Sequence, residues 1–100
     1  MKIKKGVKLN GLGTEILLAI IIATSVYEAH GIELVITSAT DSIHGYSSEH
    51  YKGDAVDIRT NTIKPETKKS FITAQIAEAL GDEFDVVLES NHLHVEYDPK

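Results

Sequence analysis

Two runs of alternating side chains near the end of the chain constrain its fold more than any other feature. FDVVLE (84–89) and HLHVEY (92–97) are separated only by Ser90 and Asn91, a spacing typical of a β-hairpin with a two-residue loop. That loop sets the register, pairing Glu89 with His92, Leu88 with Leu93, Val87 with His94 and Val86 with Val95. Because successive residues point to opposite faces, one face is apolar and the other carries Glu89, His92 and His94.

The segment at 14–29 has the apolar periodicity of a helix. Four residues at helical spacing can bury one face of it: Ile16, Ile20, Ala23 and Tyr27. Thr14 can cap its start, and Gly31 marks its end. The apolar run ILLAIIIA (16–23) follows a basic segment and so imitates a signal peptide, but Glu15 and Glu28 flank it in one continuous helical pattern. We therefore expect a buried helix of the mature domain. The run is also shorter than the roughly 20 residues of a membrane span.

The middle of the chain predicts two strands and a second helix. Residues 32–38 are rich in β-branched side chains, residues 40–53 form a polar loop, and 54–60 alternate. In that second strand Val56 and Ile58 point to one side, and Ala55, Asp57 and Arg59 to the other. Pro65 and Glu66 open a helix that ends at Gly81 and whose apolar residues are Phe71, Ile72, Ile76 and Leu80.

This order of elements predicts one α+β domain over residues 1–100. We expect a small, mostly antiparallel sheet with two main helices packed on one face, and 100 residues with 42% hydrophobic content suit one domain. A net charge of -5 with a single arginine, Arg59, argues against nucleic-acid binding. We expect a monomer.

Histidines and acids gather on the polar side of the predicted strands. His92 and His94 share a strand face, Asp57 lies on the polar face of its own strand, and Gly53 lets the loop bring His50 back. Taken singly, each is an ordinary solvated or hydrogen-bonded side chain. Together they indicate a metal site, and because the chain has no cysteine its ligands must be histidine and carboxylate.

The segment IHGYSSEHYKGDAVDI (43–58) resembles the signature SxHxxGxAxD of zinc peptidases that cut bacterial cell-wall peptides. These are the D-alanyl-D-alanine carboxypeptidases and the phage L-alanyl-D-glutamate endolysins, and the Hedgehog signalling domain shares their fold. The closing LESNHLHV resembles the family's second motif, a glutamate ahead of an HxH pair. The matching positions of the first motif are Ser48, His50, Gly53, Ala55 and Asp57.

The resemblance implies a zinc site and a function. His50, Asp57 and His94 match the zinc ligands, and three protein ligands leave a fourth position for water. Glu89 matches the general base, while His92 and His44 match histidines that line the cleft and can bind the developing oxyanion. The implied substrate is a stem or cross-link peptide of peptidoglycan. The expected site of action is the cell wall or periplasm, as for a wall-remodelling enzyme or one released by a phage lysis system.

The chain departs from the family pattern at two places. The family has an arginine for the substrate carboxylate after the first strand, whereas Asp41 stands here, which favours an endopeptidase over a carboxypeptidase. Arg59 is a candidate replacement. Glu89 also stands one residue closer to the HxH pair than in Hedgehog domains. Two alternatives stay open: a non-catalytic zinc-containing binding module of the Hedgehog type, and a zinc hydrolase of a non-peptide substrate.

Overall fold

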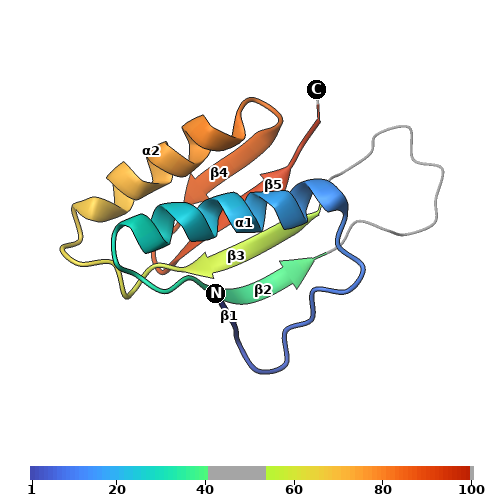
Figure 1. Ribbon diagram of the computed structural model, residues 1–100, viewed down its shortest axis with the longest axis horizontal. Coiled ribbons are helices and arrows are strands. Elements are labelled where there is room, and N and C mark those ends of the chain that lie inside the picture. The colour runs from blue at the N-terminus through green and yellow to red at the C-terminus, as the bar shows by residue number, and fades with distance from the viewer. Residues whose placement is uncertain (41–53, 100) are drawn as a thin grey trace.

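A computed structural model describes residues 1–40 and 54–99 of the chain. Within those residues the protein is α+β, as predicted, with one five-stranded sheet and two α-helices (Figure 1). The elements are β1 (Lys2–Ile3), α1 (Thr14–Ala29), β2 (Val35–Thr40), β3 (Ala55–Arg59), α2 (Lys68–Leu80), β4 (Phe84–Leu88) and β5 (His92–Tyr97).

The sheet has the strand order β1-β2-β3-β5-β4. Only β1 and β2 pair in parallel, and the other neighbours are antiparallel. The predicted hairpin register is confirmed from Val86 opposite Val95 to Leu88 opposite Leu93. The backbone N–H of Glu89 closes the loop by donating to the carbonyl of His92 at 2.8 Å.

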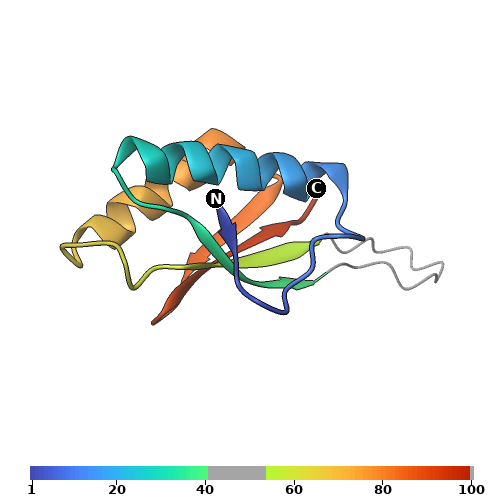
Figure 2. The ribbon, with the colours of Figure 1, turned by 60° about the horizontal axis from the view of Figure 1, so that its bottom comes forward.

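Both helices lie on the same side of the sheet (Figure 2), and the core fills the space between these layers. The predicted face of α1 is buried, with Tyr27 fully covered. Its hydroxyl donates to the carbonyl of Arg59 at 3.0 Å. Burial raises the pKa of Tyr27, which keeps that hydroxyl protonated as a donor. From the strands, the core takes Val56, Ile58, Leu93 and Val95.

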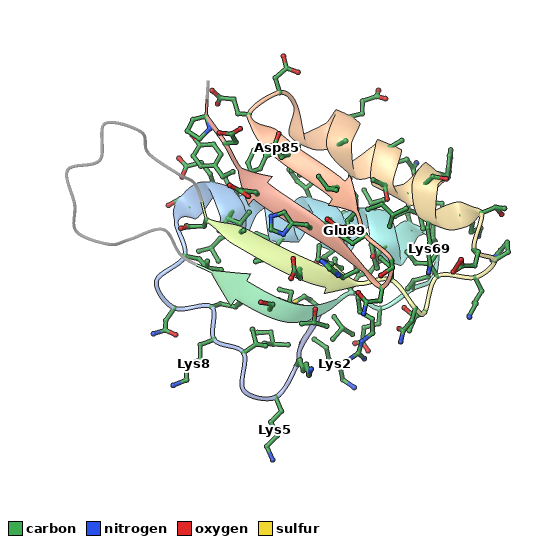
Figure 3. All side chains as sticks on the ribbon, turned by 180° about the vertical axis from the view of Figure 1, so that it is seen from behind. Lys2, Lys5, Lys8, Lys69, Asp85 and Glu89 are labelled. Atoms are coloured by element: carbon green, nitrogen blue, oxygen red, sulfur yellow. The ribbon has the colours of Figure 1, made fainter. Side chains whose placement is uncertain are left out.

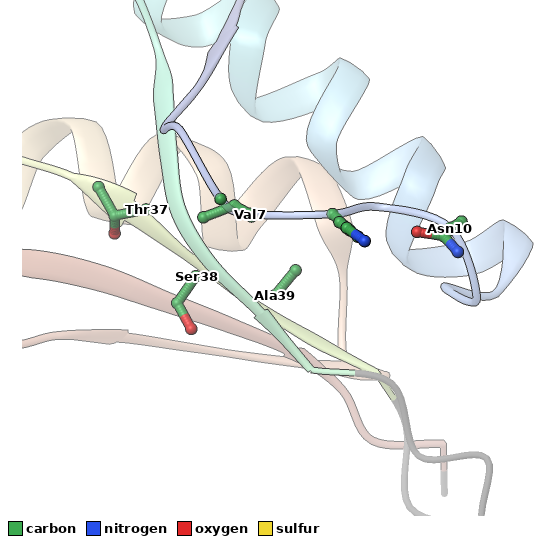
Figure 4. Close-up of a pocket in the computed structure, with 7 residues that line it drawn as sticks. Val7, Asn10, Thr37, Ser38 and Ala39 are labelled. Carbon is green, nitrogen blue, oxygen red and sulfur yellow. The ribbon is translucent and has the colours of Figure 1, made fainter.

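The other side of the sheet carries no helix among the described residues, and we call it the open face. A bulge lies on β2: Ile36 pairs with Ile58, but Ser38 pairs with Asp57, so one extra β2 residue is accommodated between them. Thr37 and Ser38 consequently point to the same side of the strand and Ala39 to the other (Figure 4). The bulge places two hydroxyl side chains beside Asp57.

Several local predictions were wrong. Thr14 does not cap α1: the helix follows Gly13, whose N–H donates to the carboxylate of Asp54, a residue only 3% exposed. This contact comes from 41 residues away and holds the residue before the helix, while no side chain caps the first turn itself.

Other element boundaries and one core residue also differ. Phe71 is 57% exposed, because α2 turns Ile72 and Ile76 toward the sheet and leaves position 71 to the side, where its ring meets His30 edge-on. Helix α2 begins at Lys68, after Pro65 and Glu66, and β2 runs two residues beyond the predicted strand end. Within the described ranges, no helix is long and apolar enough to cross a bilayer.

Candidate metal site on the open face

Asp57 and His94 face each other across the two central strands. They are direct register partners on β3 and β5, which brings together residues 37 positions apart in the sequence. Oδ1 of Asp57 lies 2.8 Å from Nδ1 of His94. Both side chains are partly covered, at 27% and 32% exposed, so their interaction is only partly screened by solvent. The structure thus joins a residue of the first motif to a residue of the second.

The second ring nitrogen of His94 also has a carboxylate partner. Oε1 of Glu96, two residues along β5, lies 3.1 Å from Nε2. Partial burial lowers the pKa of His94, but the hydrogen bonds and charges of Asp57 and Glu96 outweigh it and hold the pKa above its ordinary value. With no metal bound, the two carboxylates therefore make the His94 ring hold a proton more tightly than a free imidazole does.

His92 lies at the margin of this pair. Its Nε2 is 3.8 Å from Oδ1 of Asp57, too long for a hydrogen bond but close enough for an electrostatic contact. Its Nδ1 is held 2.8 Å from the amide oxygen of Asn91 in the hairpin loop. Arg59 pairs in register with His92 and is half-buried, so both lie at one end of the open face.

Glu89 stands apart from the Asp57–His94 pair. Figure 3 looks onto the open face and shows Asp85 and Glu89 toward opposite ends of β4. By strand alternation from Val87, which pairs with His94, Glu89 belongs to the open face. Its side chain is exposed, and in the described part of the chain no hydrogen bond or ion pair joins its carboxylate to Asp57, His92 or His94.

Three sequence-predicted positions, His44, His50 and the substituted Asp41, lie outside the described residues. In residues 1–40 and 54–99, no group of three His, Asp or Glu side chains is placed to hold a metal. The described part supplies two of the predicted ligands, one carboxylate and one imidazole, already in contact. Oxygen and imidazole nitrogen are donors that zinc accepts, so these residues fit the ion.

Glu96 and Ser38 were not assigned to this site from the sequence. A signal for Glu96 was present: His92, His94 and Glu96 alternate on one strand and so share a face. Ser38 had no such signal, because its position opposite Asp57 depends on the bulge. Ser38 also lines a polar hollow of about 460 Å³ between β2 and residues 6–10 (Figure 4), so this hollow adjoins the candidate site.

Comparison with known proteins identifies no relative. No family model matches the chain, and neither a curated protein nor a solved structure matches it significantly.

Proposed function

We propose that the protein is a zinc-dependent peptidase that hydrolyses stem or cross-link peptides of peptidoglycan. The observation that carries the proposal is the contact between Asp57 and His94. Each residue was selected from a separate sequence motif, and the sheet register brings their ligand atoms to 2.8 Å. In this proposal His50 is the third ligand, and the sheet with two helices on one side is an arrangement of the Hedgehog and D,D-peptidase type.

The chain's own residues divide the work between holding the ion and moving a proton. Asp57, His94 and His50 hold zinc, which when bound polarises a carbonyl and lowers the pKa of its water toward about 7. Glu89 takes the proton from the attacking water and delivers it to the leaving amine. Its exposed carboxylate has no partner among the described residues, so it is free to turn along the open face toward His94. His92 and His44 stabilise the oxyanion by hydrogen bonding.

The charge pattern favours an endopeptidase. A carboxypeptidase must bind the terminal carboxylate of its substrate, and the acid at Asp41 would repel it. An internal amide carries no such charge. Arg59, half-buried at one end of the open face, is a cation that could bind a substrate side-chain carboxylate.

The second candidate function is a zinc-containing binding module without hydrolysis. It is favoured by the separation of Glu89 from the Asp57–His94 pair, because a module that only recognises its partner needs no general base. The two candidates share the zinc site and differ in the role of Glu89.

Digestion of purified cell wall, with the peptide products identified by mass, tests the proposal. We expect new peptide ends that disappear when a chelator is added and return with zinc. The matched control is His94→Ala, which should retain the fold and release no ends. Wall binding with zinc but without new ends would support the binding module, and a protein that binds no zinc would contradict both.

A further inference from the structure

His94 has a carboxylate oxygen at each ring nitrogen, so Asp57 and Glu96 compete to determine which nitrogen carries the proton. Asp57 lies 2.8 Å from Nδ1, and Glu96 lies 3.1 Å from Nε2. A neutral imidazole carries one N–H and one lone pair. Each carboxylate accepts the proton of the nitrogen it faces, so the two acids favour opposite tautomers.

Metal binding can use only one of these tautomers. For the ion to be shared between His94 and Asp57, the lone pair must lie on Nδ1, the nitrogen that faces Asp57. Asp57 by itself favours the wrong form, because it attracts a proton onto Nδ1. A second acceptor at Nε2 is therefore needed to keep the proton on the far side of the ring.

Glu96 is placed for that role by the strand itself. It lies two residues after His94 and so on the same face, and its partner across β3 is Ala55, whose short side chain leaves the carboxylate room. The Glu96 side chain is 35% exposed, and its Oε1 lies 3.1 Å from Nε2 of His94.

We propose that Glu96 is a positioning residue: it holds the proton of His94 on Nε2 and so presents Nδ1 toward Asp57 for the metal. The inference rests on the proposed zinc site and adds a residue to it. Carboxylates that accept the second N–H of a ligating histidine fix the ring and its tautomer in other metal sites, and their loss weakens metal binding about 10- to 100-fold.

Glu96→Val tests the proposal, because it removes the acceptor and leaves a β-branched side chain that suits a strand. Chelator competition should show zinc binding about 10- to 100-fold weaker. Glu96→Gln keeps an amide oxygen that can accept from Nε2, so its affinity should lie between those of Glu96→Val and the parent. The matched control is Asp85→Val, which removes a carboxylate paired with Glu96 across the strand and without a contact to His94.

A second measurement needs no metal. Nitrogen NMR of the zinc-free protein, at a pH where the ring is neutral, should report a larger share of the Nε2–H tautomer of His94 in the parent than in Glu96→Val, because only the parent has an acceptor at Nε2. Equal zinc affinity in the parent and Glu96→Val, or an unchanged tautomer, would overturn the role of Glu96. If the parent binds no zinc, the proposed function fails, and the tautomer alone then decides the assignment of Glu96.

Discussion

The two faces of strands β3 and β5 have different roles: one face forms the core, and the other carries the candidate metal site. On the helix side Val56, Ile58, Leu93 and Val95 are at most 2% exposed. On the open face their immediate neighbours Asp57 and His94 are about one-third exposed and bind each other. Since alternate residues point in opposite directions, fold and site are separated by one position along the strand. Open-face residues can therefore change with little effect on folding, whereas helix-side residues cannot.

The strongest test of this difference between the faces is to truncate two adjacent residues of β5, one on each face. Leu93→Ala leaves a cavity in the core and should lower the free energy of unfolding by about 2–5 kcal/mol. His94→Ala, one residue along, should change the stability of the zinc-free protein by less than about 1 kcal/mol, because its partners are solvent-accessible. Denaturant unfolding in chelator measures both. Comparable losses would show that the two faces are not independent.

The same variants separate folding from metal binding. His94→Ala should lose zinc, while Leu93→Ala should retain it under conditions in which the variant is folded. Because zinc binds only the folded chain, saturating zinc should raise the melting temperature of the parent and of Leu93→Ala but leave that of His94→Ala unmoved. Zinc stabilisation of His94→Ala equal to that of the parent would exclude this residue as a ligand.

Glu89→Gln tests whether the open face divides its work between residues that hold the metal and a residue that moves a proton. The variant keeps the size and polarity of the side chain and removes the base. We expect about 100-fold or greater loss of turnover on wall peptides, with zinc affinity and melting temperature unchanged. Rates come from timed digestion with saturating zinc. Hydrolysis at the parent rate would place the base elsewhere.

What the sequence predicted well depended on short-range rules. The hairpin register followed from two loop residues and strand alternation. The sheet face to which His94 belongs was therefore predicted correctly. The buried face of α1 followed from helical spacing in the same way. The separation of core and polar residues on β3 was also correct, because it too depends on alternation alone.

What the sequence did not predict depended on distant segments. The residue before α1 is held by Asp54, the predicted local cap Thr14 is not used, and nothing near Gly13 in the sequence encodes this contact. The bulge that sets Ser38 opposite Asp57 arises from pairing with β3. Phe71 was misplaced because one helical step turns a side chain by about 100°, which carries position 71 away from the buried side of Ile72 and Ile76.

A pH series tests the charged pair directly. The pKa of His94 in the zinc-free fold is raised above the ordinary value of 6.5, so the fold binds a proton that the unfolded chain binds less tightly. This contribution to stability is fully present below about pH 6.5 and is lost as the pH rises through the raised value. In chelator, the parent should therefore lose stability relative to His94→Gln as the pH rises above about 6.5. Zinc should show the opposite trend and bind more tightly as the pH rises, because the ligand ring must be neutral. If the parent and His94→Gln show parallel stability curves, the coupling of His94 to the two carboxylates is absent in solution.

The smallest expected effect concerns Arg59, at the end of the open face beside His92. Its guanidinium can bind a substrate carboxylate through two parallel hydrogen bonds, which the ammonium of lysine cannot reproduce. Arg59→Lys keeps the charge, so we expect KM on wall peptides to rise by about 3- to 10-fold while kcat stays the same, a loss of about 1 kcal/mol of uniform binding. Lys5→Gln is the control: this lysine is exposed and points away from the sheet in Figure 3, and its loss should leave KM unchanged. A fall in kcat with KM constant would instead show that Arg59 makes an interaction that is present only in the transition state. Unchanged kinetics would exclude the Arg59 guanidinium from substrate binding.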